Sequence, residues 1–346
     1  MFPAPSFAHL ERLSDETGLL EHARLLTPRR SHGYTTDDVA RGLIAVCRQP
    51  APGPELIRLA EVYLAFLEHA RRSDGGYHNR LSFDRRWADA AGSGDSHGRA
   101  LWALGVAAEL ASEPWLREAA ASAFRMSRPP VGKWLRPHAF AVLGAFAMLA
   151  ADPSDHAAAA MLRESAHHLP QAGAEPWPWP ERRLSYENAR IPEALLAAGA
   201  GLPDPAAVTG GLALLEWLVA IETRDGRYSF IPAGGWAPGE VRPGFDQQPV
   251  EAAAMADACA RAFEITADPA WADRVLQAAR WLTGDNDTGT PLYDAAAGSC
   301  ADGLTPHGAN GNSGAESTVS AIFVLQQARR VGAGVPAGRA VREGWS

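Results

Sequence analysis

Two kinds of helix alternate along this chain, and their alternation restricts the fold more than any other feature of the sequence. The first kind is apolar nearly all round and rich in alanine and glycine, so it must be buried on every side. The second kind is amphipathic, with one face for packing and one for water. The apolar helices are expected over Thr36–Arg48, Asp95–Ala111, Lys133–Ala151, Tyr186–Ala200, Pro249–Thr266 and Ala315–Arg329. The amphipathic helices are expected over Glu55–Arg72, Pro114–Met126, Ser154–Leu169, Pro205–Thr223 and Pro269–Leu282.

The two kinds follow one another in a strict order of buried helix, short turn, amphipathic helix and long loop. Periodicity and turn residues predict no strand pair. With segment 7–26 as a sixth outer partner, the pattern is that of an all-α (α/α)6 toroid. A helical bundle or an open solenoid is the alternative, although solenoid units would resemble one another more closely. We therefore predict a single barrel domain over residues 1–346, in which residues 1–30 pack as an outer helix and residues 333–346 form a flexible tail.

Composition limits the classes of partner that this chain can bind and the cellular compartment in which we expect it. The formal net charge of -8 argues against nucleic acid, because phosphate binding needs a basic surface. The most apolar stretch, Phe140 to Ala151, is too short to span a bilayer. The N-terminus has no basic patch followed by an apolar segment, so no secretion signal is expected. Three widely spaced cysteines suit a reducing compartment, and we predict a cytoplasmic location.

Polar clusters stand at the start of each apolar helix. Parallel inner helices would bring these clusters to one end of a toroid, where long tryptophan-bearing loops would also lie. Sugars require such surroundings, because hydroxyls need polar partners and the C–H faces of a pyranose pack against aromatic rings. The substrate-binding candidates are His32, Tyr34, Asp37, His97, Arg99, Arg136, His138, Trp179, Tyr186, Asn188, Arg190, Asp246, Gln248, Glu251 and Asn312.

Three carboxylates on different inner helices, Asp38, Asp95 and Glu316, are the catalytic candidates. Each also has an ordinary interpretation as a helix-start residue, since acidic side chains complement the positive end of the helix dipole. Asp95 could be an N-cap, and Ser313 with Glu316 fits a capping box. Capping does not explain the histidines and arginines on helices that are otherwise apolar. Those side chains must face a wet cavity or one another, because unpaired buried charges are costly.

No cofactor is predicted. The sequence lacks the glycine-rich motifs that bind nucleotides and the G-x-S-x-G nucleophile elbow. It also lacks an H-E-x-x-H motif and a cysteine pair, so we predict no metal ligands.

Three phrases of the sequence carry a resemblance to a known family. They are the stretches from His32 to Arg41, from Asp95 to Gly105 and from Asn312 to Thr318. They resemble a bacterial family of (α/α) six-hairpin, glycosidase-like proteins, which are often labelled glycosyltransferases because homologous segments occur with glycosyltransferase modules. The resemblance covers the chain from about Leu13 to Leu325. It implies a carbohydrate-active toroid that acts on an oligosaccharide or glycoconjugate, with a glycosyltransferase as a possible partner.

The preferred mechanism is cleavage of a glycosidic bond with inversion, by hydrolysis or phosphorolysis. It needs an acid and an opposing base, separated by roughly 6.5–9.5 Å. Phosphorolysis would need a cation for the phosphate, such as Arg99, Arg136 or Arg190. A sugar epimerase using His97 and His138 as a proton-transfer pair is the first alternative. A non-catalytic glycan-binding subunit of a glycosyltransferase system is the second, and a terpene cyclase is more distant.

Overall fold

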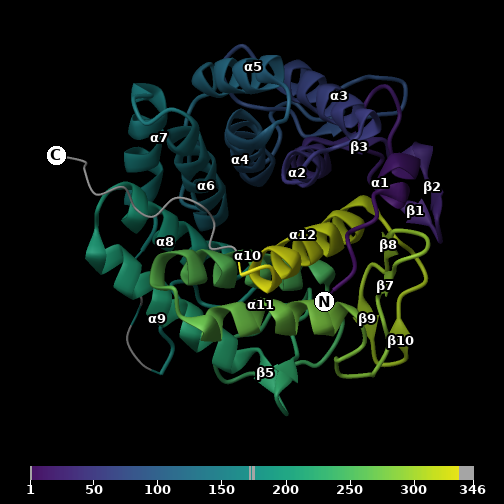
Figure 1. Ribbon diagram of the computed structural model, residues 1–346, viewed down its shortest axis with the longest axis vertical. Helices are drawn as coiled ribbons and strands as arrows, with labels where there is room; N and C mark the ends of the chain where they lie inside the picture. The colour runs from purple at the N-terminus through teal and green to yellow at the C-terminus, as the bar shows by residue number, and fades with distance from the viewer. Residues whose placement is uncertain (1, 171–172, 174–175, 335–346) are drawn as a thin grey trace. The chain divides into compact units, whose positions relative to one another are not determined.

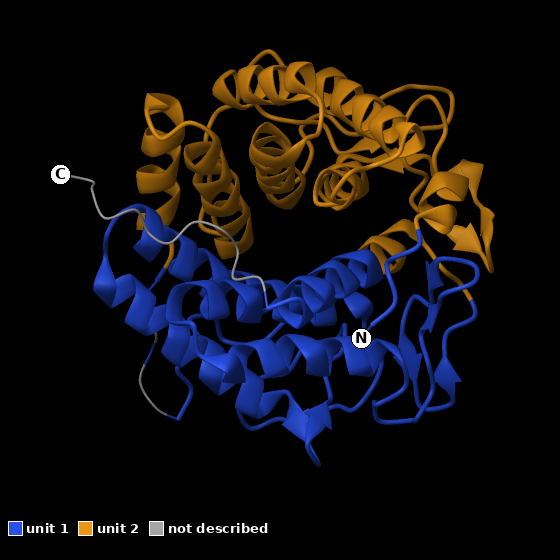
Figure 2. Ribbon diagram, in the orientation of Figure 1, with its two compact units in different colours: residues 1–6, 170–311, 320–346 blue, residues 7–169, 312–319 orange. Residues whose placement is uncertain are grey.

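The computed structural model describes residues 2–170, 173 and 176–334 (Figure 1). The chain divides into two compact units (Figure 2). Unit 1 holds residues 1–6, 170–311 and 320–346, and unit 2 holds residues 7–169 and 312–319. All but the first two residues of the predicted tail lie outside the described residues.

Unit 2 is built from paired inner and outer helices. Helices α2, α4 and α6 form the inner row, in which α4 packs against both of its neighbours. Each inner helix also packs against the outer helix that follows it in the chain (Figure 1). The bounds are Ala8–Leu13 for α1, Thr36–Cys47 for α2, Pro54–Ala70 for α3, Gly94–Leu110 for α4, Pro114–Arg125 for α5, Leu135–Ala151 for α6 and His156–His167 for α7.

Unit 1 repeats the same pairing. Helix α8 packs against α9, α10 packs against α11, and α8 contacts α10. Helix α12 begins in unit 2 and continues into unit 1 from Ser320. The bounds are Arg190–Gly201 for α8, Pro205–Ile221 for α9, Pro249–Thr266 for α10, Pro269–Leu282 for α11 and Ala315–Gly332 for α12.

Small residues allow the inner helices to approach closely. A Cβ atom on Gly105 of α4 would collide with the carbonyl oxygen of Gly144 on α6, and a Cβ atom on Gly144 would collide with the carbonyl oxygen of Leu101. Only glycine tolerates this backbone-to-backbone contact. The alanine-rich and glycine-rich character of these helices is therefore a requirement of their packing.

Two predicted helices begin or extend differently in the structure. Segment 7–26 is helical only over Ala8–Leu13, and it continues as turns and a short strand. Helix α8 begins at Arg190 rather than at Tyr186, because Glu187 has a positive φ of 43° and Asn188 Oδ1 accepts a hydrogen bond from Ser185 N. Because a residue in the left-handed conformation cannot lie inside a right-handed α-helix, α8 cannot extend back through Glu187 to Tyr186.

The prediction that the chain contains no strand pair is wrong. Short antiparallel ribbons, each with two residues per strand, occur in both units. The loop between β5 and β6 consists of Asp225 and Gly226, both at positive φ, which is the tight hairpin turn that such a pair favours. The other pairs are too short to produce an alternating pattern. The pairs are β1 (Ala23–Arg24) with β2 (Thr27–Pro28), β3 (Tyr34–Thr35) with β4 (Arg80–Leu81), β5 (Thr223–Arg224) with β6 (Arg227–Tyr228), β7 (Tyr293–Asp294) with β8 (Ser299–Cys300), and β9 (Leu304–Thr305) with β10 (Gly308–Ala309).

Candidate functional site

Five charged side chains meet at the start of α2 in unit 2. The first turn of α2 supplies Asp37 and Asp38, and the next turn supplies Arg41. Helix α4 supplies Arg99, and the first turn of α12 supplies Glu316. Three inner-helix starts therefore contribute to one cluster, which we call the α2 cluster.

Arg41 holds the cluster together. Its Nη1 atom lies 3.2 Å from Asp37 Oδ2 and 3.3 Å from Asp38 Oδ1, and its Nη2 atom lies 3.0 Å from Glu316 Oε2. Residues three and four apart share a helix face, so Arg41 reaches both aspartates of its own helix. The guanidinium is buried, whereas the Glu316 side chain is 41% exposed. Two of the three catalytic candidates therefore bind opposite ends of one buried cation, and one of them is open to solvent.

Asp38 is buried and holds its proton more tightly than an ordinary aspartate. Thr35, the N-cap of α2, accepts a hydrogen bond from Asp38 N at 3.0 Å and donates one to Asp38 Oδ2 at 2.7 Å. Burial raises the pKa of Asp38 to about 7, with Arg41 opposing the rise and the charges of Asp37 and Glu316 adding to it. The Asp38 carboxyl therefore exchanges its proton near neutral pH, as a general acid or base must.

Arg99 joins the α2 cluster through Asp37. Its guanidinium forms an ion pair with Asp37, and it lies over the ring of Phe140 with 4.4 Å to the ring centroid. Arg136 is buried in the first turn of α6. Asp95 is half-buried in the first turn of α4, where Ser93 is the N-cap, so Asp95 is not the cap of this helix.

His97 and His138 each bind a backbone carbonyl oxygen. The Nε2 atom of His97 lies 2.8 Å from the carbonyl oxygen of Arg128, and that of His138 lies 3.0 Å from the carbonyl oxygen of Gly132. Burial lowers the pKa of His97 to about 4 and also lowers the pKa of His138. Both rings are therefore neutral at pH 7, each bound to a different backbone carbonyl.

The remaining candidates of unit 2 lie near the N-terminal segment. Tyr34 is buried and its hydroxyl donates to Asp15 Oδ2 at 2.6 Å. Asn312 is exposed, and its side-chain oxygen accepts from Leu25 N at 3.0 Å. His32 is half-buried at the end of a 3-10 turn, Arg30–His32. Tyr34 and Asn312 each form a hydrogen bond with the N-terminal segment, and the role of both in substrate binding stays a prediction.

Arg190 lies in the core of unit 1, inside an ion cluster. Its guanidinium lies 3.3 Å from Glu187, 2.7 Å from Glu193 and 2.7 Å from Asp257, and every one of these side chains is nearly inaccessible to water. The three carboxylates raise the pKa of Arg190 against the effect of its burial. Arg190 therefore binds carboxylates of its own chain, and its role in sugar binding stays a prediction.

Glu251 and Asn188 also serve the backbone of unit 1. Glu251 Oε1 accepts from Glu187 N at 2.5 Å, and Glu251 Oε2 accepts from Asn188 N at 3.2 Å and from Asn188 Nδ2 at 3.3 Å. Both side chains are buried. These hydrogen bonds connect the turn before α8 to the first turn of α10. They account for the burial of both polar side chains without a bound substrate.

Three further candidates of unit 1 are more accessible. Tyr186 is 40% exposed, Asp246 is exposed, and Gln248 is half-buried. Gln248 occupies the N-cap position of α10, but its side chain does not cap the helix.

The predicted tryptophan Trp179 belongs to an aromatic cluster in unit 1. Its ring stacks on that of Trp217 with the centroids 6.2 Å apart, and it is buried. Trp177 contacts both Trp217 and Trp236, with centroids 5.2 Å and 5.4 Å away. The rings of Trp177 and Trp236 are half-buried, so this cluster is only partly accessible.

Sequence reasoning missed Arg41, which lies at the centre of the α2 cluster. It also missed two of the acidic partners of Arg190, which are Glu193 and Asp257. Arg41 follows Asp37 by four positions, a spacing that signals an ion pair on a helix. Glu193 and Asp257 stand inside apolar helices, where a buried acid implies a buried cation. Glu222 is also buried, and its pKa is raised well above the usual value by burial and by the neighbouring charge of Glu251.

Comparison with known proteins relates the chain to others through its fold. No family model and no curated protein matches the sequence. Among solved structures, a sugar epimerase from a ruminal bacterium is similar at 11% identity and a TM-score of 0.70, covering 92% of this chain and 95% of that one. The cellobiose 2-epimerase of Bacillus thermoamylovorans is similar at 11% identity and a TM-score of 0.70, covering 94% and 96%. The cellulase Cel9M of C. cellulolyticum is similar at 8% identity and a TM-score of 0.61, covering 91% and 88%.

These similarities extend over almost the whole length of each protein and confirm the predicted all-α (α/α)6 toroid class, the six-hairpin glycosidase-like fold. At such low identity they establish the fold and leave the reaction open. Within the described part of the chain, no helix has both the length and the apolar character needed to cross a membrane.

Proposed function

We propose that this chain is a carbohydrate-active enzyme that cleaves a glycosidic bond with inversion, and that the α2 cluster is its reaction centre. The observation that carries the proposal is the pair of unlike carboxyl groups, Asp38 and Glu316, on one guanidinium. One is buried with a pKa of about 7, and the other is open to solvent. Glycoside cleavage uses two carboxyl groups whose surroundings separate their roles in this way.

The surroundings assign a role to each group. Asp38 is the general acid, because burial keeps part of its population protonated at neutral pH. Glu316 is the general base, because water can reach it. Arg41 positions both, and Asp37, which pairs with Arg99, binds the same Nη1 atom of Arg41 as Asp38 does. Asp95 stays a prediction, and no step is assigned to it.

Water is the preferred acceptor of the cleaved sugar. Two of the three arginines considered for phosphate already bind carboxylates, since Arg99 pairs with Asp37 and Arg190 pairs with three acids. A guanidinium that is neutralised in this way attracts a phosphate less strongly. Hydrolysis is therefore favoured over phosphorolysis.

Epimerisation or isomerisation of a sugar is the second candidate. The similarity to a sugar epimerase, a cellobiose 2-epimerase and a D-mannose isomerase, at TM-scores of 0.67 to 0.70, favours it. The geometry argues against the histidine pair as its base and acid, because both rings bind backbone carbonyls. For this second candidate, we propose Asp38, with a pKa of about 7, as the group that carries the proton.

One screen distinguishes the candidates. The purified protein is incubated with oligosaccharides and free reducing sugars in D2O, with and without phosphate, and the products are followed by proton NMR. Hydrolysis with inversion gives a new reducing end whose first anomer is opposite to that of the substrate. An epimerase gives a C2-deuterated sugar of unchanged length, and phosphate dependence identifies a phosphorylase. Glycan binding without any turnover would instead make the chain a binding subunit and would overturn the proposal.

Three further proposals accompany this one. We propose that the two units together form a single catalytic domain, that the protein works in the cytoplasm, and that a glycosyltransferase is a partner. The first is tested by limited proteolysis, which should release no stable fragment that corresponds to either unit. The other two are tested by fractionation of the native cell and by co-purification with a tagged chain.

A further inference from the structure

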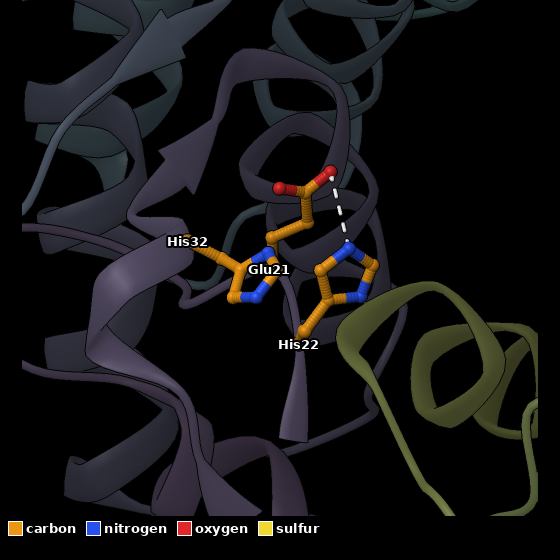
Figure 3. Close-up of side chains that lie close together, drawn as sticks. All are labelled: Glu21, His22 and His32. Carbon is orange, nitrogen blue, oxygen red and sulfur yellow. Dashed lines mark ion pairs between the residues drawn. The ribbon is translucent and has the colours of Figure 1, made fainter. Parts of the chain in front are cut away.

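Two histidines and a glutamate converge on the surface of unit 2 (Figure 3). Glu21 and His22 are consecutive residues, and His32 reaches them from the 3-10 turn that follows β2. Among the residues that the structure describes, this is the group of three whose potential ligand atoms all lie within 4.8 Å of one another. We propose that Glu21, His22 and His32 form a binding site for a divalent transition-metal ion of the Zn²⁺ type.

The distances suit a shared ion. His22 Nε2 lies 3.6 Å from Glu21 Oε1, and the dashed line in Figure 3 marks this ion pair. Two ligand atoms on one tetrahedral Zn²⁺ ion, at about 2.0–2.1 Å from it, stand roughly 3.3 Å apart. The rings of His22 and His32 are nearly perpendicular, with centroids 4.8 Å apart, so they do not stack against each other. Small rotations of two side chains would therefore complete three ligands of a tetrahedral site.

Arg80 orients the glutamate. Its guanidinium donates two hydrogen bonds to Glu21, at 2.8 Å to Oε2 and 2.7 Å to Oε1. Each carboxylate oxygen has two lone pairs, so Glu21 Oε1 can accept from Arg80 and still bind an ion on its other side. A second group that fixes a ligand in this way is a common feature of metal sites.

The donor atoms select the kind of ion, because the group offers two imidazole nitrogens and one carboxylate oxygen. A neutral imidazole is the form that binds metal, and His22 and His32 each offer one ring nitrogen. Nitrogen ligands favour Zn²⁺, Ni²⁺ and Cu²⁺ over Mg²⁺ and Ca²⁺.

A bound ion would join segments that backbone hydrogen bonds already connect. His22 O accepts from Arg29 N at 2.8 Å, and Glu21 O accepts from Ala315 N at 3.1 Å. Gly33, next to His32, has a φ of 68°, and a Cβ atom there would collide with Leu81 O. The ligands therefore stand on a well-defined turn rather than on a free end, which lowers the ordering cost of binding.

Isothermal titration of the full chain with ZnCl2 tests the site. The parent should bind one Zn²⁺, while His22→Ala and His32→Ala should each weaken binding about tenfold or more. His167→Ala is the matched control, because His167 is exposed and adjoins another histidine, His168, at the C-terminal end of α7. It should bind as the parent does. The three cysteines are buried and should not compete.

Zinc should also raise the melting temperature of the parent and of His167→Ala, but not that of His22→Ala, because a ligand that binds only the folded state stabilises it. Parent-like zinc affinity in both His22→Ala and His32→Ala would overturn the proposal. So would a parent that binds no Zn²⁺, or binding that is lost in the His167→Ala control.

Discussion

Replacing Asp38 by asparagine should make the folded protein more stable while it lowers activity. Burial raises the pKa of Asp38 from its ordinary value of 3.8 to about 7. The folded state therefore binds this proton more tightly than the unfolded chain does. Because the unfolded chain binds fewer protons between these two values, stability due to Asp38 is greatest at low pH and falls as the pH rises from about 4 to about 7.

The size of the effect follows from the shift. About three pH units at about 1.4 kcal/mol each amount to roughly 4 kcal/mol. Loss of the contact between Asp38 and Arg41 reduces the gain, although Arg41 keeps Asp37 and Glu316 as partners. We therefore expect Asp38→Asn to unfold at higher urea than the parent at pH 8, by about 1–3 kcal/mol.

Urea unfolding of the two proteins at pH 5 and pH 8 measures the difference. The advantage of Asp38→Asn should shrink at pH 5, where the parent carries the proton itself. The exposed Asp273→Asn on α11 is the control, and it should match the parent at both values. An Asp38→Asn protein that is less stable than the parent at pH 8 would refute the reasoning, because it would show that the ionised carboxylate stabilises the fold.

Three other outcomes are expected. Gly105→Ala should lower the free energy of unfolding by about 2 kcal/mol, because its Cβ atom would collide with backbone of Gly144, whereas Gly332→Ala on α12, with open space around it, should not. Arg190→Met should cost about 3–5 kcal/mol in urea unfolding, because it leaves buried carboxylates without their cation; a loss below 1 kcal/mol would contradict the buried ion cluster. The His97 ring should titrate near pH 4 in an NMR experiment, and a midpoint near 6.5 would show that the ring is not buried. Because the unfolded chain binds more protons there, the His97 contribution to stability falls as the pH drops from 6.5 to 4.

The order of helices was predictable because each inner helix has a composition that only complete burial permits. The bounds of α10 and α11 match the predicted ranges, since Pro249 and Pro269 fix where these helices begin. The short ribbons were not predictable, because two residues per strand give no alternating pattern. The start of α8 was missed because the left-handed φ of Glu187 depends on contacts with Glu251, 64 residues away in the chain.

The candidate site was predictable in part. Asp37, Asp38, Arg99 and Glu316 were singled out from the starts of three different helices, and the fold brings them onto Arg41. Sequence alone could not separate such groups from those that serve the backbone, because both kinds are polar residues at helix starts. The distance from each side chain to its partners and the burial of each side chain distinguish the two kinds. Neither quantity can be derived from composition.

The most direct test of the central claim is to compare the turnover of the parent, Asp38→Asn and Glu316→Gln on a sugar that the parent converts. Asp273→Asn serves again as the control. If the α2 cluster is the reaction centre, both cluster variants should lose about 10²–10⁴-fold in kcat, as removal of a general acid or base does, while the control keeps the parent rate. If both cluster variants keep the parent rate, the carboxyl groups on Arg41 are structural, and the reaction, if there is one, takes place elsewhere.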